Sequence, residues 1–265
     1  MTTTRIRALM AKEFLDLSRN RLALVPVGLI TILSLVMPFI IAVAIPYWTG
    51  EELGSDSDLL KVSGVVGHAA LTPSARVQLF LFQQFLLLFL MTPITGAMAL
   101  ASHAVVGEKQ ARTLEPLLAT PVTTGELLVA KVLGSLLPTL VISLAGVALY
   151  LAGITTMAAP GVAASMLNVR TALLVAFVGP AAALVSLQAA IIISSRVNDA
   201  RTAQQFGVLI IIPLAAVLVA QFTGSLWLSS TTLGLLGLGL AVLWLLLLLV
   251  SVAIFDRDSI LVKWR

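Results

Sequence analysis

Six apolar runs that contain no Asp, Glu, Lys or Arg constrain this chain more than any other feature. A helix of about 20 apolar residues can cross the hydrocarbon core of a bilayer, so each run predicts a spanning helix. The fifth run is the shortest, and Thr223-Gly224-Ser225 predicts a turn after it. The sequence therefore predicts an all-α integral membrane protein with six transmembrane helices, at about residues 22–46, 77–104, 132–153, 171–194, 206–222 and 232–255.

The composition agrees with a membrane protein and leaves no soluble domain. Of the 265 residues 59% are hydrophobic and 11% are charged, whereas about a quarter of a soluble domain is charged. We expect one membrane domain over residues 1–265. The first run is longer than the apolar segment of a secretory signal, which favours an uncleaved span. Cysteine is absent, which excludes disulfides and thiolate sites.

The basic residues orient the predicted bundle. If residue 1 lies in the cytoplasm, the inner segments hold 13 of the 16 Lys and Arg residues, and the outer segments keep Lys61, Arg76 and Arg170. The positive-inside rule then places both termini in the cytoplasm, in a multi-pass protein of the cell (inner) membrane. Orientation explains the net charge of +4 better than a nucleic-acid partner, and we expect none. We expect four aromatic residues at headgroup level on the outer side: Tyr47, Trp48, Tyr150 and Trp227.

Two segments outside the spans have helical patterns or caps. Residues 1–21 space apolar and basic residues as in a helix that lies in the inner interface, although a solvated basic leader is the alternative. The outer loop after the first span carries Glu51, Glu52 and other acids, which we interpret as solvated rather than cation-binding. It ends in Thr72-Pro73, which predicts the cap and first residue of the second span.

The predicted membrane interior is nearly free of ionisable groups. Ion-coupled carriers need such groups within the membrane, so a secondary carrier is disfavoured, as is a metal site. The polar candidates for a substrate path are Gln83, Gln84, Gln188 and Gln221. Prolines interrupt five of the six runs, which suits a bundle that opens but also occurs in static membrane proteins.

Residues 107–131 form a charged insert between the second and third runs. From Glu108 to residue 119 the apolar residues share one helical face, which predicts a short helix lying flat beneath the bilayer. Pro121 ends it. Thr123 and Glu126 then form a capping box, and the new helix runs through Lys131 into the third span. The insert is therefore predicted to be an elbow whose second arm is continuous with a span.

The insert, GEKQARTLEPLLATPVTTGELLVAK, resembles the signature segment of ABC-2 type permeases, the membrane subunits of ATP-binding-cassette exporters. The six-run order, the leader MAKEFLDLSRNR, the inner loop SSRVNDARTAQQ and the tail FDRDSILVKWR are also similar. The resemblance implies a cytoplasmic coupling helix within 108–119, seated in an ATPase, and a connecting helix before the first span. The coupling residues it implies are Glu108, Arg112, Thr113, Leu114, Glu115, Leu117, Leu118, Pro121, Glu126 and Lys131.

The resemblance also implies partners. The chain has no G-x-x-x-x-G-K-[ST] phosphate loop, so we expect no enzymatic activity and no cofactor here, and ATP with Mg²⁺ in a separate ABC ATPase. The second partner implied is another permease copy, in a homodimer or a paired permease. The expected substrate is a lipid, drug-like or otherwise amphipathic molecule that the complex exports. A non-transporting membrane anchor on the same scaffold remains the main alternative.

Overall fold

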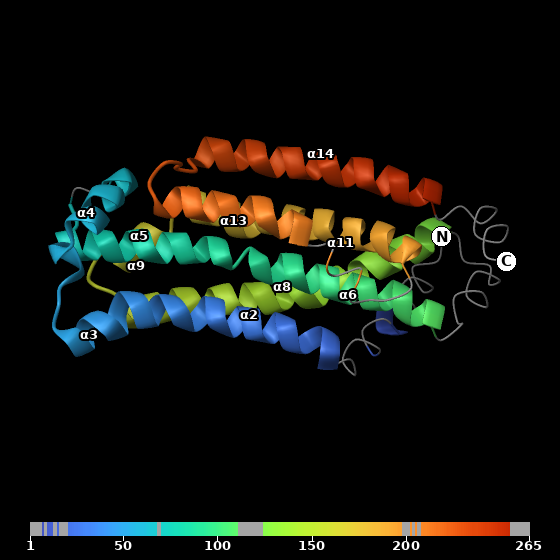
Figure 1. Ribbon diagram of the computed structural model, residues 1–265, viewed down its shortest axis with the longest axis horizontal. Coiled ribbons are helices and arrows are strands. Elements are labelled where there is room, and N and C mark those ends of the chain that lie inside the picture. The colour runs from blue at the N-terminus through green and yellow to red at the C-terminus, as the bar shows by residue number, and fades with distance from the viewer. Residues whose placement is uncertain are drawn as a thin grey trace.

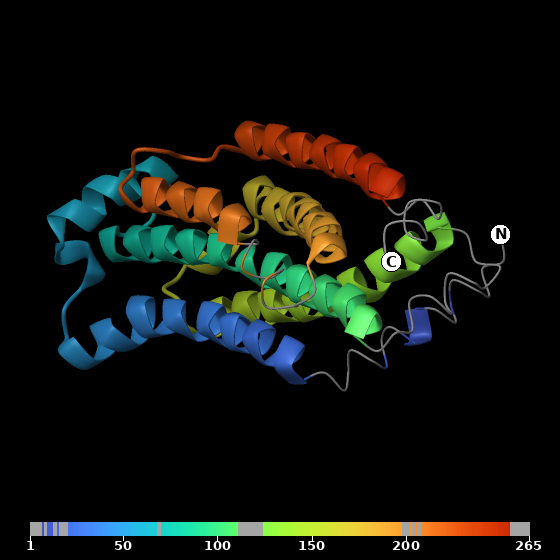
Figure 2. The same ribbon diagram turned by 45° about the vertical axis from the view of Figure 1, so that its right-hand side comes forward.

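The computed structural model describes residues 7, 10–12, 15, 21–67, 70–110, 124–197, 202, 205 and 208–254. This part of the chain contains helices and turns and no strand, as the sequence predicts. The long helices lie side by side along one axis (Figure 1). The start of the first long helix and the end of the last lie at one end of the bundle, opposite the connection between the first two spans (Figures 1 and 2).

The elements follow one another as a series of passes along this axis. The first pass and the connection after it comprise α2 (Arg21–Phe39), η1 (Ile40–Ala44), α3 (Ile45–Thr49), η2 (Leu53–Ser55), α4 (Ser57–Ser63) and η3 (Gly64–Val66). The middle passes comprise α5 (Pro73–Leu88), α6 (Met91–Gln110), α8 (Thr124–Met157), α9 (Val162–Met166), α10 (Val169–Leu173), η4 (Leu174–Val178) and α11 (Gly179–Arg196). The last two helices are α13 (Val208–Phe222) and α14 (Ser230–Ile254).

Five stretches in the described part of the chain are long and apolar enough to cross a membrane: Val27–Thr49, Pro73–Ser102, Val129–Met157, Val169–Arg196 and Ser230–Ala253. They correspond to five of the six predicted spans. The predicted fifth span falls on α13, which has 15 residues in the structure. It is followed by the predicted turn, where Gly224 takes a φ of 71° that favours glycine. Six spans therefore remain a prediction, of which five are supported by length and composition.

Prolines mark several interruptions within the passes. Pro46 follows the π-helix η1, and Pro180 follows the π-helix η4. Pro93 follows the short break between α5 and α6. A proline lacks the N–H that its helix would use and its ring crowds the carbonyl four residues earlier, which explains the altered winding. Pro138 and Pro213, by contrast, lie inside α8 and α13 without ending them.

The spans differ in burial, in the opposite order to their hydropathy. Within an apolar 18-residue part of Pro73–Ser102, 83% of the residues are buried inside the protein, and the mean hydropathy, 1.9, is the lowest of the five stretches. In the corresponding parts of Val27–Thr49 and Ser230–Ala253, 17% and 11% of the residues are buried, with mean hydropathies of 2.6 and 2.8. In Figure 1, α5 and α6 lie between α2 on one side and α14 on the other. The second pass is thus the centre of the bundle, and the first and last passes form its rim.

The caps and aromatic residues test two further predictions. Thr72 caps α5, because its hydroxyl accepts the Ala75 N–H at 3.3 Å, and Pro73 is the first helical residue. Tyr47 and Trp48 are 84% and 76% exposed, and their level in the membrane stays a prediction. The prediction for Tyr150 is wrong: this side chain is fully buried and its hydroxyl donates to the Phe82 carbonyl at 2.8 Å. Burying the ring among phenylalanines outweighed the interfacial preference because a carbonyl satisfied its hydroxyl.

Candidate functional site

All four glutamines predicted to line a path are buried in the bundle. Gln83 is 3% exposed, and Gln84, Gln188 and Gln221 are fully buried. They do not form one cluster of hydrogen-bonded partners. Gln83 and Gln221 both accept hydrogen bonds from one arginine, whereas Gln84 and Gln188 have other surroundings.

Arg170, in α10, is the arginine that joins two of these glutamines. Its Nη1 donates to Gln83 Oε1 at 2.6 Å, and its Nη2 donates to Gln221 Oε1 at 3.3 Å. Its Nε donates to the Leu228 carbonyl at 2.9 Å, and its guanidinium carbon lies 4.1 Å from the centre of the Trp227 ring. A guanidinium over an indole face at this distance is attracted by the ring quadrupole. We call Arg170, Gln83, Gln221 and Trp227 the Arg170 cluster.

The sequence reasoning missed this cluster because it placed Arg170 in an outer loop. In the structure the helix begins earlier, since Asn168 caps it by accepting the Thr171 N–H at 2.9 Å. Arg170 is thereby in the first helical turn, and its side chain reaches Gln83 on α5 and Gln221 on α13. An asparagine just ahead of an apolar run is a recognised cap signal. This signal could have moved the predicted start of the fourth span to Val169. It could not have revealed the hydrogen-bond partners of Arg170.

A row of aromatic rings continues from the Arg170 cluster. Trp227 stacks on Phe80 with centroids 6.5 Å apart and an interplanar angle of 19°. Phe80 meets Phe222 edge to face at 6.4 Å, and Phe222 meets Phe85 in the same manner at 6.1 Å. Phe222 is 38% exposed. The cluster is therefore continuous with an apolar wall that reaches the surface of the bundle.

Gln84 and Gln188 are buried away from the Arg170 hydrogen bonds. Within the described part of the chain, neither amide atom of Gln84 has a hydrogen-bond partner. Gln188 donates through Nε2 to the Ser251 hydroxyl, which joins α11 to α14, and its Oε1 is unpartnered among the described residues. Buried amides without partners are unfavourable. The buried amide of Gln84 therefore lowers the stability of this conformation.

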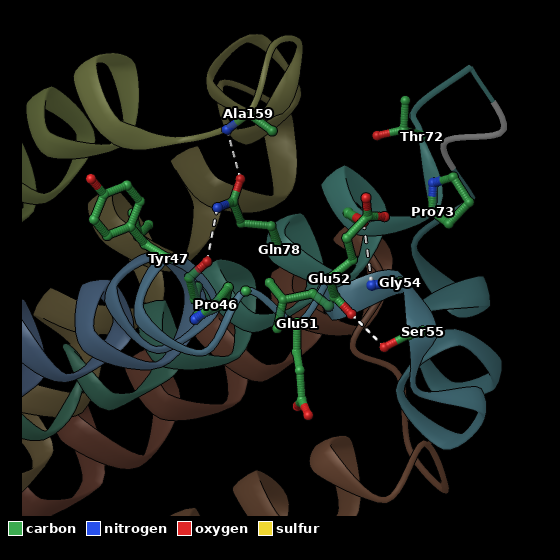
Figure 3. Close-up of a pocket in the computed structure, with 15 residues that line it drawn as sticks. Pro46, Tyr47, Glu51, Glu52, Gly54, Ser55, Thr72, Pro73, Gln78 and Ala159 are labelled. Atoms are coloured by element: carbon green, nitrogen blue, oxygen red, sulfur yellow. Dashed lines mark hydrogen bonds between the residues drawn. The ribbon is translucent and has the colours of Figure 1, made fainter.

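A cleft of about 1010 Å³ opens at the end of the bundle that carries α3 and α4 (Figure 3). Its lining includes Tyr47, Glu51 and Glu52, and none of the four predicted glutamines. Gln78 closes its floor by donating from Nε2 to the Ala42 carbonyl at 2.9 Å and accepting the Ala159 N–H at 2.7 Å. Ala42 is the residue four before Pro46, which has no N–H to donate. Gln78 donates a side-chain hydrogen bond to this carbonyl beside the proline.

The helix α8 is a single element of 34 residues that begins before the membrane stretch Val129–Met157. Its first turn contains Glu126, which is 2% exposed, and Lys131 follows at 1%. The predicted continuity from Glu126 through Lys131 into the third span is therefore observed. Because both side chains are buried, the beginning of α8 packs against the rest of the protein.

Comparison with protein families decides what kind of membrane protein this is. Residues 7–255 match the family described as ABC-2 family transporter protein. The chain belongs to the ABC-2 transporter family. A comparison with curated proteins gives no match. As a member of this family the chain is a transmembrane permease of an ABC transporter, and the family implies association with an ABC ATPase.

The coupling residues of this ABC-2 permease lie only partly in the described chain. Glu108 lies in the last turn of α6, so residues 108–110 continue the second pass rather than begin a separate flat helix. The coupling residues that lie outside the described residues are Arg112, Thr113, Leu114, Glu115, Leu117, Leu118 and Pro121, together with the cap at Thr123.

Charges enter the spanning stretches more than predicted. The apolar runs were predicted to hold no formal charge, yet the stretches in the structure include four basic residues near their ends: Arg76, Lys131, Arg170 and Arg196. Basic residues near the end of a span can direct their charge toward polar groups because their side chains are long. Among the described residues, no group of three His, Cys, Asp or Glu side chains could hold a metal ion.

Proposed function

We propose that this ABC-2 permease is the membrane subunit of an exporter for an amphipathic substrate, driven by ATP hydrolysis in a separate subunit. The family match carries the proposal. It is supported by the sequence, which contains no phosphate loop and so needs an external source of energy. A lipid or drug-like substrate fits an interior whose buried polar side chains are mostly amides and hydroxyls.

The proposed topology has six spans with both termini in the cytoplasm. Charge distribution in the sequence supports this orientation. The arrangement in Figure 1 is compatible with it, because α2 starts and α14 ends at the same end of the bundle. In this orientation α3, α4 and the cleft of Figure 3 face outward. The start of α8 and the end of α6 face the ATPase.

Coupling is proposed to act through the elbow at residues 107–131 and through α8. Closure of two ATPases around ATP would displace the elbow, and α8, which continues past Pro138 without ending, would carry that displacement across the membrane. A second permease copy, identical or paired, would complete the path.

The test is to replace one elbow charge and measure partner binding and turnover. Glu115→Arg reverses a charge in the proposed ATPase seat. Glu51→Arg makes the same change in the exposed connection after the first span and is the matched control. We expect Glu115→Arg to abolish ATPase co-purification or substrate-stimulated hydrolysis, with membrane insertion intact, and Glu51→Arg to preserve both.

Unchanged co-purification and unchanged stimulated turnover in Glu115→Arg would refute the coupling assignment. Transport of an amphipathic substrate by the reconstituted complex separates a permease from a non-transporting anchor. An anchor would bind its ATPase normally and show no ATP-dependent movement of any lipid or drug tested. Mass spectrometry of molecules that co-purify with the complex would name the substrate.

A further inference from the structure

Among the residues that the structure describes, no carboxylate pairs with the positive charge of the Arg170 cluster. In the described part of the chain, every hydrogen-bond acceptor of Arg170 is neutral: two amide oxygens and one backbone carbonyl. A guanidinium has five N–H groups, and these contacts use three of them. The remaining two have no acceptor among the described residues, so the cation is oriented by the protein but not paired.

A second donor at the same place is also unused. Gln221 is fully buried and gives its Oε1 to Arg170, yet its Nε2 has no partner in the described chain. Buried amide donors are normally hydrogen-bonded, to protein or to a bound molecule. Within the described chain, the cluster therefore combines a cation that has no carboxylate partner with a buried donor that has no acceptor. Both features would be satisfied by the oxygens of an anion.

The surroundings indicate what kind of anion fits. The aromatic row from Trp227 through Phe80 to Phe222 begins at the cluster and reaches the apolar surface of the bundle. A molecule with its charge at Arg170 could place an apolar tail along this row and in the surrounding lipid. Arg170 is half-buried near the end of its spanning stretch, a depth suited to a lipid head group.

We propose that the Arg170 cluster binds the anionic head group of a membrane amphiphile, with a phosphate as the group that meets the guanidinium. The planar fork of arginine matches two phosphate oxygens. A purely structural clamp between α10, α5 and the Leu228 carbonyl would not need the charge. The binding site does not depend on the proposed transport cycle or on the ATPase.

The experiment uses the full-length chain, without ATPase, in nanodiscs of zwitterionic lipid. Phosphatidylglycerol with brominated acyl chains is titrated in, and quenching of tryptophan fluorescence is recorded, with brominated phosphatidylcholine as the neutral comparison. The Trp227→Phe variant keeps a ring over Arg170 and identifies the share of the signal that comes from Trp227. We expect the anionic lipid to quench Trp227 at a mole fraction about tenfold lower than the neutral lipid does, the effect of a charge-assisted contact.

Three variants test the role of the charge. Arg170→Gln should remove the preference for the anionic lipid, and Arg170→Lys should retain most of it because the charge remains. Lys61→Gln removes an outer basic residue that already faces Asp58 at 3.6 Å and should change nothing. Equal quenching by the two lipids in the unaltered chain would overturn the proposal even if Arg170→Gln failed to fold.

Inorganic phosphate distinguishes a lipid from a free anion. The preference for phosphatidylglycerol should persist when inorganic phosphate replaces sodium chloride at equal ionic strength. Loss of the preference under that replacement would show that the site takes small anions, and the assignment to an amphiphile would be wrong. An unchanged preference in Arg170→Gln would also refute it, because the anion would then bind elsewhere.

Discussion

Replacing Gln78 by leucine tests whether this side chain holds the floor of the cleft together. Its two hydrogen bonds join the end of the first pass to the loop after α8, at 2.9 Å to the Ala42 carbonyl and 2.7 Å from the Ala159 N–H. Gln78→Leu removes both. Ala42 is 1% exposed, and water cannot readily replace the lost donor. Ala159 is half-buried, which lets water compensate in part.

The expected cost follows from what is left unsatisfied. A buried polar group without a partner costs about 1–3 kcal/mol, and Ala159 should contribute at the low end of this range. We expect Gln78→Leu to lower the free energy of unfolding by about 2–4 kcal/mol. Gln84→Leu is the matched control on the same helix. Its amide has no partner among the described residues, so the same substitution should be neutral or stabilise by up to about 2 kcal/mol.

A rescue variant separates the hydrogen bond from packing. Pro46→Ala provides an N–H four residues after Ala42, which can donate to the same carbonyl in an α-helix. In the Gln78→Leu background this change should recover about 1 kcal/mol or more, whereas in the unaltered chain it should recover nothing. The two effects should therefore be non-additive.

The assay is equilibrium unfolding of the full chain in mixed micelles with increasing denaturing detergent, followed by tryptophan fluorescence and by circular dichroism. Coincident transitions by both probes allow the free energies to be compared. Equal shifts for Gln78→Leu and Gln84→Leu would refute the reasoning, because hydrogen bonding is what distinguishes the two sites. Additivity of Pro46→Ala with Gln78→Leu would contradict the account of the Ala42 carbonyl.

Three further predictions follow from the helix contacts. A Cβ at Gly96 would lie 2.6 Å from the Thr139 Cγ2 atom, so Gly96→Ala should lower the free energy of unfolding by about 1–3 kcal/mol. Thr139→Ser removes that atom and should relieve the cost in a double-mutant cycle. Additive effects of the two substitutions would refute the close contact. Val129→Pro, at a 40% exposed position in α8, should uncouple ATP hydrolysis from transport because proline removes a helix hydrogen bond there, whereas Val129→Ala should not. Coupled turnover in the proline variant would refute transmission through α8. If Gln84 lines a substrate path, Gln84→Leu should reduce transport in liposomes without lowering thermal stability, and unchanged transport would remove it from the path.

Local patterns in the sequence predicted local features well. Apolar runs predicted five spanning stretches because the length of an apolar run decides whether a helix can cross the bilayer. That length can be read from the sequence without knowing which helices lie beside it. Thr72 and Pro73 predicted the start of α5 because a cap involves only adjacent residues. The turn at Gly224 followed from the same short-range chemistry. Each of these depends on the chain within a few residues.

Contacts between distant segments were not predictable from one sequence. Arg170 looked like a loop charge because its acceptors lie far away in the chain, on Gln83 and Gln221. Tyr150 looked interfacial because the carbonyl that satisfies its hydroxyl belongs to Phe82, in another pass. Spacing identified Gln83 and Gln221 as buried, but no periodicity shows which buried amides meet. The role of the coupling residues also depends on the proposed ATPase, and the surface of that partner cannot be read from this sequence.

The inverse order of hydropathy and burial has a consequence for how this protein is made. The second pass is the least hydrophobic of the five stretches and the most buried, at 83%, and it leaves the ribosome before α8, α11 and α14 exist to cover it. Lipid is a poor substitute for those helices around Gln78, Gln83 and Gln84, because hydrocarbon offers no hydrogen bonds. Biosynthesis must therefore keep this central segment near the insertion machinery until later helices arrive. The rim helices, at 17% and 11% burial, can enter the bilayer on their own.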